Sequence, residues 1–142
     1  MSVTTTASTP PGTYAVTITG ISTSPSLTHS TTVTLVVTST GSPDFSISAS
    51  PSSQTVARGN STSYTVTVAP INGFNGTVTF RVRGLPSGSS ASFNPGSVTG
   101  QGTSTLTVST SASTPTGTST LRIRGTSGGG ANHNTTVQLV VQ

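Results

Sequence analysis

Few side chains in this sequence can take part in acid–base or metal chemistry. The 142 residues include one carboxylate, Asp44, and two histidines, His29 and His133, with no cysteine and no lysine. General acid–base and nucleophilic catalysis need a positioned acid, base or activated nucleophile, and one carboxylate cannot form a catalytic pair within one copy. Calcium sites need several oxygen ligands, mostly carboxylates, and thiolate metal sites need cysteine. We therefore expect no enzyme activity, no cofactor and no metal site.

The two histidines occupy equivalent positions in two similar segments. Residues 29–37 recur as residues 133–141, at an offset of about 104 residues. A Ser-His-Asp triad needs a histidine with a nearby acid, and Asp44 is the only acid in the chain. We interpret both histidines as structural, because their position repeats, and Asp44 as a polar residue of a linker.

The arginines form the second chemically interesting group. Four of the five occur as two pairs, Arg81 with Arg83 and Arg122 with Arg124. Residues two apart on a β-strand point to the same face. If the two strands are neighbours in one sheet, the four guanidinium groups form a stripe on its outer face. Two interpretations stay open: attachment to an anionic glycan or an adjacent subunit, or a solvated face that supplies solubility.

The overall charge argues against nucleic acid as a partner. The formal net charge is +4 and the sequence pI is about 11.4, but this balance rests on five arginines and one acid. Proteins that bind nucleic acid concentrate many Lys and Arg on one face and add aromatic side chains for stacking. The chain also lacks an apolar run of about 18 residues, so we expect no membrane insertion.

Three N-glycosylation sequons begin at Asn60, Asn75 and Asn134. Ser and Thr supply about 41% of the chain, and such a composition generates sequons frequently. We treat these three residues as candidate glycosylation sites.

The elements that position these residues are short strands. Hydrophobic residues make up 29% of the chain and charged residues 4%, and the apolar residues alternate with Thr and Ser between Gly and Pro turns. This alternation is typical of half-buried strands, and about seven strands in about 100 residues are typical of an Ig-like antiparallel β-sandwich. The expected strands are 45–48 with its continuation 54–57, 63–68, 76–83, 90–93, 103–109, 118–124 and 136–141.

The part of the chain from residue 43 onward resembles a bacterial Ig-like repeat. The resemblance rests on several short motifs: Pro43-Asp44-Phe45-Ser46-Ile47, Gly73-Phe74-Asn75-Gly76-Thr77-Val78, Gly84-Leu85-Pro86-Ser87-Gly88 and Ala91-Ser92-Phe93-Asn94-Pro95. Such units stand in tandem on secreted and cell-surface bacterial proteins, as spacers, stalks and adhesive modules. The resemblance therefore implies an all-β fold and an extracellular or cell-surface location, and it implies no role for the arginines.

The sequence also begins within a repeat. Residues 7–13 recur as residues 112–118, at an offset of about 105. We expect residues 1–37 to be the C-terminal three strands of a preceding unit (1–4, 13–19 and 31–37), residues 38–43 a linker, and residues 44–142 a complete domain. Met1 falls opposite Leu106, at a buried strand position, which favours a cut through a longer polypeptide over the start of a short polymer subunit.

Three strands with one apolar face are not stable alone in water. That face must be covered by the front part of another copy, either earlier in the same chain or in a neighbouring subunit. The predicted function is therefore structural and non-catalytic: a tandem Ig-like array forming a stalk, fibre or surface filament, with adhesion as a further role. The alternative is an accessory spacer or carbohydrate-binding module of a secreted bacterial enzyme, which would need exposed aromatic residues on a flat face.

Overall fold

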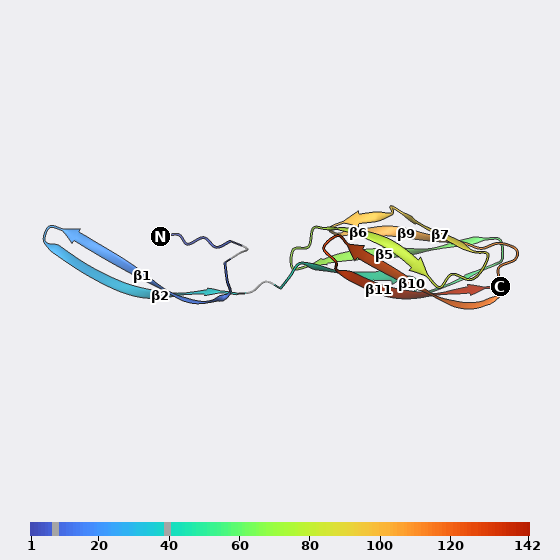
Figure 1. Ribbon diagram of the computed structural model, residues 1–142, viewed down its shortest axis with the longest axis horizontal. Coiled ribbons are helices and arrows are strands. Elements are labelled where there is room, and N and C mark those ends of the chain that lie inside the picture. Colours follow the sequence, from blue (N-terminus) through green and yellow to red (C-terminus); the bar gives the residue numbers. More distant parts are fainter. Residues whose placement is uncertain (7–8, 39–40) are drawn as a thin grey trace. The chain divides into compact units, whose positions relative to one another are not determined.

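The computed structural model describes residues 1–6, 9–38 and 41–142, and it divides into two units (Figure 1). Unit 1 is Met1–Gly41 and unit 2 is Ser42–Gln142. Residues 7–8, which begin the repeated motif, and residues 39–40, in the middle of the expected linker, lie outside the described residues. The division between the units falls inside the linker expected from the sequence.

Unit 2 is a sandwich of two β-sheets. One sheet has the order β3-β5-β9-β7 and the other the order β4-β11-β10-β6-β8. This arrangement matches the immunoglobulin pattern of strands A, B, E and D facing strands C, F and G, so the all-β, Ig-like expectation is confirmed. All pairs are antiparallel except β4, which runs parallel to β11. The bounds are β3 Asp44–Ser50, β4 Ser53–Val56, β5 Ser61–Ile71, β6 Thr77–Arg83, β7 Ser90–Asn94, β8 Ser97–Thr99, β9 Gly102–Ser109, β10 Gly117–Ser127 and β11 Asn132–Val141.

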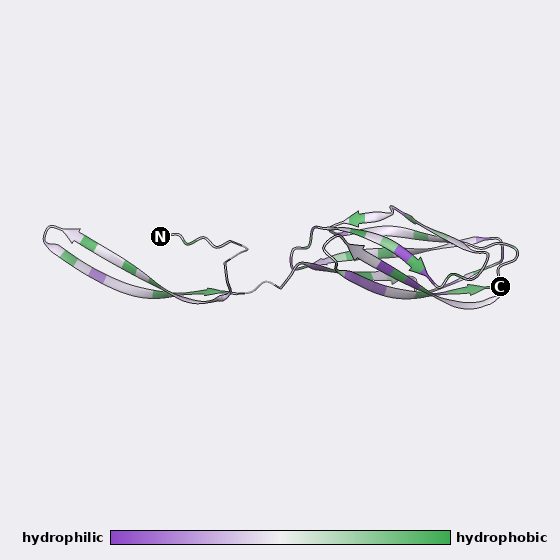
Figure 2. Ribbon diagram, in the orientation of Figure 1, coloured by the Kyte–Doolittle hydropathy of each residue, from purple (hydrophilic) through white to green (hydrophobic). Residues whose placement is uncertain are grey.

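The core of unit 2 follows from the alternation of apolar and hydroxyl side chains. Apolar and polar residues alternate along these strands (Figure 2), and the apolar positions are mostly buried whereas most Thr, Ser and Arg positions are exposed. The hydroxyl of Tyr64 crosses the core and donates to the carbonyl of Gln138 at 2.7 Å, which joins the two sheets. The fully buried apolar side chains include Phe45, Tyr64, Val66, Val68, Val78, Leu106, Val108, Leu121, Ile123 and Leu139.

One strand of the sandwich was not expected. Strand β8 pairs with β6 through Thr77 and Thr99, and it buries Val98. The sequence predicted no strand between the expected strands 90–93 and 103–109. A three-residue strand with one apolar residue shows no periodicity, so it carries no signal that alternation can detect.

Unit 1 contains a β-hairpin of strands β1 (Gly12–Thr23) and β2 (Ser26–Val37). Residues 1–6 form no strand, so the expectation of a third strand at residues 1–4 is wrong. The equivalent strand in unit 2, β9, pairs with β5 on one side and β7 on the other. Unit 1 has no counterpart of either strand among its described residues, and a single strand without a hydrogen-bonding neighbour does not form.

The hairpin of unit 1 has the same register as the β10–β11 hairpin of unit 2. Gly20 pairs with His29, and the equivalent Gly125 pairs with His133. The turn before β1 also repeats: the amide of Thr6 donates to the Thr9 hydroxyl at 3.0 Å, as the amide of Ser111 does to Thr114 at 2.9 Å. The one-residue difference in the two offsets lies in the hairpin turn. Each residue of 12–21 and 28–37 therefore has a definite paired counterpart in β10–β11.

A tyrosine near the start of β1 adds an immunoglobulin feature. The hydroxyl of Tyr14 donates to the carbonyl of Pro10, four residues upstream, at 2.8 Å. A tyrosine at the start of the sixth strand that bonds back to the upstream backbone is characteristic of Ig-like sandwiches. This bond supports assigning β1 as the sixth strand of an Ig-like unit.

Candidate interaction sites

The apolar face of the β1–β2 hairpin is open, whereas its counterpart in unit 2 is covered. Ile18 and Val33 are 37% and 45% exposed, and their equivalents Ile123 and Val137 are 0% and 1% exposed. The other apolar positions show the same difference in exposure. Val16, Leu35 and Val37 are half-buried, whereas their counterparts Leu121, Leu139 and Val141 are buried. The same side-chain pattern therefore exists in this chain once with a cover and once without.

Two equivalent glycines, Gly20 and Gly125, show the same difference in how closely other residues pack against them. A Cβ on Gly125 would lie 2.9 Å from Val78, 3.1 Å from Phe45 and 3.2 Å from Ile47, whose side chains belong to the facing sheet and to β6. The equivalent Gly20 has only the His29 carbonyl oxygen near it, at 3.9 Å. Glycine is thus required at position 125 by close packing, and position 20 holds the same residue without that packing.

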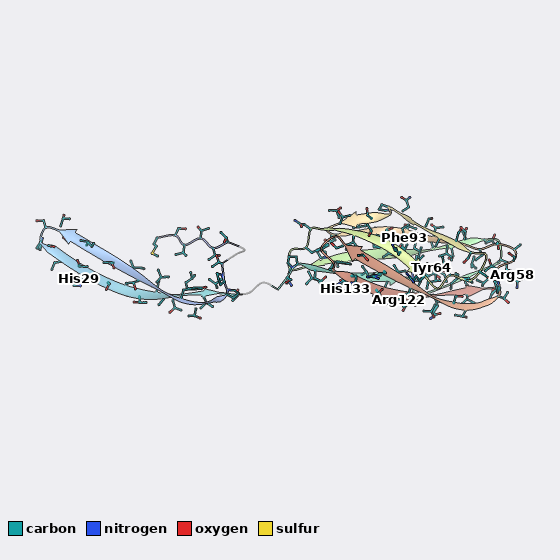
Figure 3. The ribbon with its side chains drawn as sticks, viewed as in Figure 1. His29, Arg58, Tyr64, Phe93, Arg122 and His133 are labelled. Carbon is teal, nitrogen blue, oxygen red and sulfur yellow. The ribbon has the colours of Figure 1, made fainter. Side chains whose placement is uncertain are left out.

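A hydrogen bond links the first and last strands of the sandwich. His133 lies on β11 (Figure 3). Its Nε2 atom lies 2.8 Å from Oδ1 of Asp44 on β3, and its ring stands edge-on to Phe45 with ring centroids 4.8 Å apart. The amide of Phe45 also donates to this carboxylate, at 2.8 Å. The bond from His133 and then the Phe45 amide lower the pKa of Asp44 below its usual 3.8.

The interpretation of Asp44 as a linker residue is therefore wrong, because Asp44 begins β3 and joins the two sheets. His133 acts as a structural residue in this bond. Its counterpart His29 lies on β2, and unit 1 contains no side-chain carboxylate. An acid that matched His29 in this way would have to come from outside unit 1.

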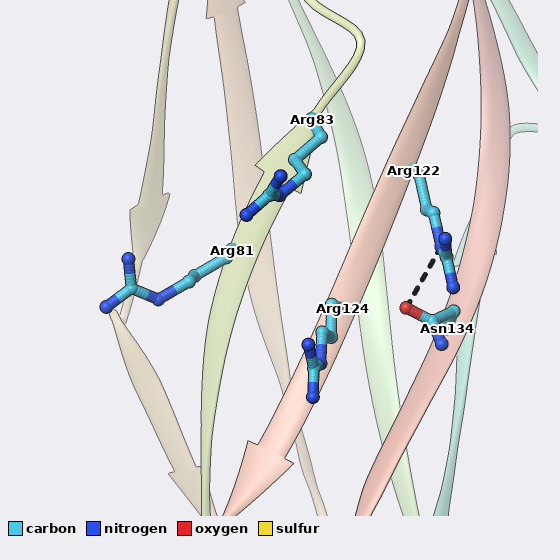
Figure 4. Close-up of a pocket in the computed structure, with 5 residues that line it drawn as sticks. All are labelled: Arg81, Arg83, Arg122, Arg124 and Asn134. Atoms are coloured by element: carbon cyan, nitrogen blue, oxygen red, sulfur yellow. Dashed lines mark hydrogen bonds between the residues drawn. The ribbon is translucent and has the colours of Figure 1, made fainter.

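The structure brings the four predicted arginines together. Arg83 lies opposite Arg122, and Arg81 lies opposite Arg124, on the neighbouring strands β6 and β10. With Asn134 of β11 they line a groove of about 310 Å³ on the outer face of the five-stranded sheet (Figure 4). The Nε atom of Arg122 donates to Oδ1 of Asn134 at 3.2 Å. We call this surface the arginine groove.

The close approach of β6 and β10 at the groove depends on one glycine. Gly84 follows Arg83 and has φ near +89°, in the left-handed region. A Cβ at this position would collide with the carbonyl oxygen of Thr120. The expected turn Gly84-Leu85-Pro86-Ser87-Gly88 thus lets the end of β6 lie tightly against β10.

The three sequon asparagines are exposed. Asn60 lies before β5, Asn75 lies before β6, and Asn134 lies on β11. Asn134 also borders the arginine groove, a placement that sequence reasoning missed because strand 136–141 was expected to begin after it.

The aromatic residues do not form an exposed binding platform. The half-buried Phe74 packs on Phe45 with ring centroids 5.2 Å apart, and Phe80 stacks on Phe93 at 5.4 Å. All six aromatic residues lie within the described part of the chain, and Tyr14, at 39%, is the one among them that is exposed. The feature that a carbohydrate-binding module would use for stacking is therefore not found on the described residues.

The described residues contain neither a metal-binding group nor a membrane-spanning helix. Residues 1–6, 9–38 and 41–142 hold no group of three or more His, Cys, Asp or Glu placed to bind a metal ion. The same residues include no helix long and apolar enough to span a membrane.

This chain has the same fold as domains of known structure. No family model matches this chain, and no curated protein matches it. The structure of domains 4 and 5 of the S-layer protein SbsC matches 92% of this chain with a TM-score of 0.53 and 22% identity, and this chain covers 65% of that structure. The structure of S-layer protein rSbsC(31-844) matches 94% with a TM-score of 0.56 and 23% identity, and this chain covers 17% of it. The chain thus spans less than two thirds of either structure and shares their fold.

Proposed function

We propose that this chain belongs to a structural, non-catalytic surface protein built from Ig-like units in tandem, and that β1–β2 is the last strand pair of one such unit. The observation that carries the proposal is the shared register of β1–β2 and β10–β11, with the same apolar positions open in one hairpin and buried in the other. An extracellular or cell-surface location is part of this proposal.

The fold comparison supports the tandem arrangement. The SbsC structures contain successive domains of a surface-layer protein, domains 4 and 5 in one structure and domains 1–6 in another. Their match extends over more than nine-tenths of this chain, so it includes most of the β1–β2 hairpin as well as the sandwich. A structural role also agrees with an outer surface of Thr and Ser and few charged residues.

The cover that fits the open face is the front part of an Ig-like unit that lacks its own last hairpin. In unit 2 the strands that cover the β10–β11 hairpin are chiefly β3, β5 and β9, and their apolar side chains already pack against that hairpin. A second copy of unit 2 therefore has no vacancy for β1–β2 unless β10–β11 first leaves. We propose accordingly that the cover is covalently linked ahead of β1, as in a tandem array, rather than supplied by strand exchange between subunits.

A fusion protein tests this proposal. Met1 aligns with Leu106, so residues 42–105 placed directly ahead of Met1 would rebuild a complete unit from this chain's own sequence. We expect the backbone amides of β1 and β2 to become as protected from hydrogen exchange as those of β10 and β11. The unfused chain is the control, because an isolated hairpin is only marginally stable in water. Unchanged exchange of β1 and β2 in the fusion protein would contradict the proposal.

N-glycosylation of Asn60, Asn75 and Asn134 remains a prediction that fits an extracellular protein. Their exposure makes each amide accessible to modification. The measurement is the intact mass of the protein from its native source, in which occupied sites would add sugar mass to the 14.0 kDa of these 142 residues.

A further inference from the structure

We propose that the arginine groove binds an acidic polysaccharide, with the guanidinium groups pairing with the acidic groups of the polymer. This proposal does not depend on what covers the β1–β2 hairpin. It begins from the arrangement of charge: two arginines on each of two adjacent strands, with Arg83 directly opposite Arg122 and Arg81 directly opposite Arg124. Like charges directly opposite each other destabilise a sheet. A sheet that carries two such pairs side by side is favoured when an anion lies between them.

The chain itself cannot supply that anion. Its one side-chain carboxylate, Asp44, is 2.8 Å from His133, where it joins β3 to β11. A second copy of this chain brings one side-chain acid, its own Asp44, so an adjacent identical subunit cannot neutralise four guanidinium groups either. The partner must be a different molecule that carries several negative charges.

The spacing of the groove fits a polymer with regularly placed acidic groups. Residues two apart on one strand are separated by roughly 6–7 Å, and neighbouring strands by about 4.8 Å. The Nε atom of Arg122 donates to Asn134, and no described residue bonds its two terminal amino groups. A guanidinium held in this way can offer those groups to a carboxylate or sulfate as a paired, bidentate contact.

The residues around the groove favour sugar over nucleic acid. Along the same sheet face the arginines are flanked by hydroxyl and amide side chains. Exposed Thr79 and half-buried Thr126 lie beside one pair, and exposed Thr120, hydrogen-bonded to half-buried Gln138, lies beyond the other. Such side chains suit the hydroxyl groups of a sugar chain. No aromatic side chain lines the groove, although aromatic stacking is a main source of affinity for single-stranded nucleic acid.

The test uses the full chain and polygalacturonate, an acidic polysaccharide that bears a carboxylate on every sugar. The matched neutral probe is the same polymer with its carboxylates methyl-esterified. We compare the wild-type chain, a variant with Arg81→Gln, Arg83→Gln, Arg122→Gln and Arg124→Gln together, and the control Arg58→Gln. Arg58 is exposed but does not line the groove. Binding is measured by titration calorimetry at low salt and at higher salt.

We expect the wild-type chain and Arg58→Gln to bind the acidic polymer alike and the fourfold variant to bind it at least about tenfold more weakly, with a smaller salt dependence. The esterified polymer should not bind. In the wild-type chain, the acidic polymer should change the NMR chemical shifts of backbone amides on β6, β10 and β11. This measurement does not depend on a variant that must fold. Absence of binding, equal loss in Arg58→Gln, equal binding of the esterified polymer, or equal affinity for duplex DNA would each overturn the proposal.

Discussion

At the scale of single residues, the sandwich is tied together by polar contacts that cross between its sheets. The Asp44 carboxylate accepts hydrogen bonds from His133 and from the Phe45 amide, and these bonds lower its pKa. A carboxylate whose pKa is lower in the folded state contributes stability above its unfolded pKa, near 3.8. That contribution disappears as the pH falls through the folded pKa.

We therefore predict that Asp44→Asn makes the sandwich less stable at neutral pH, and that the difference from wild type shrinks as the pH falls from about 5 to about 2. Below the folded pKa the wild-type carboxyl group is protonated, and it no longer has the advantage of a charged acceptor. Urea unfolding at several pH values measures the difference. A destabilisation that stays constant across this pH range would show that the charge of Asp44 contributes nothing.

Tyr64 provides a second test at this scale. Its hydroxyl is inside the sandwich, donates to the Gln138 carbonyl, and has a pKa raised by burial, so it stays protonated as a donor. Tyr64→Phe leaves that carbonyl without its partner, and we expect a loss of about 1–2 kcal/mol in unfolding free energy. Tyr14→Phe is the matched control, because the bond from Tyr14 to Pro10 is in unit 1. The sandwich should unfold as in wild type in that variant, and an equal loss in both would contradict the assignment.

At the scale of elements, the two hairpins differ in how they tolerate the same substitution. Gly125→Ala places a methyl group against Val78, Phe45 and Ile47, and we expect it to cost about 1–3 kcal/mol through overpacking. Gly20→Ala meets no such crowding and should leave the unfused chain unchanged. Thermal unfolding measures both variants. In the fusion with residues 42–105, Gly20→Ala should become as costly as Gly125→Ala; if it stays harmless there, the rebuilt unit does not pack as unit 2 does.

Alternation along the chain predicted most strands and the direction of their side chains, because strands such as β5 and β6 carry apolar residues at every second position. It failed where strands continue through polar residues. Strand β11 begins at Asn132 rather than at residue 136, and β1 and β2 extend beyond residues 19 and 31 toward their turn. Backbone pairing holds those ends. Their residues are mostly polar or Gly, with Ile21 and Leu27 as isolated apolar residues, so they leave no periodic signal.

The sequence predicted the arginine groove, but it predicted neither the bond between Asp44 and His133 nor the place of Asn134 in the groove. The Ig-like strand order implied that the strands bearing Arg81 and Arg124 would be neighbours, so the arginine groove was predictable. The bond between Asp44 and His133 was not, because it joins residues 89 apart in the sequence and depends on how the two sheets face each other. The place of Asn134 in the groove required the true start of β11.

At the scale of the whole molecule, the chain contains one covered and one open copy of the same hairpin, and the open one exposes apolar side chains to water. Exposed apolar faces drive association, so we expect the unfused chain to self-associate as its concentration rises. The combined variant Ile18→Thr and Val33→Thr makes the two most exposed of the compared positions on that face polar and should reduce the association. Sedimentation measures the association.

The same substitutions at the equivalent positions, Ile123→Thr and Val137→Thr, give the matched control. They place hydroxyl groups in the sandwich core and should lower its unfolding free energy by several kcal/mol, about 1–3 for each buried hydroxyl, whereas Ile18→Thr and Val33→Thr should leave it unchanged. The fusion protein should stay monomeric, because its added strands cover the open face. If the fusion protein associates as strongly as the unfused chain, the apolar face of β1–β2 is not what the front part of a unit covers, and the tandem arrangement loses its physical basis.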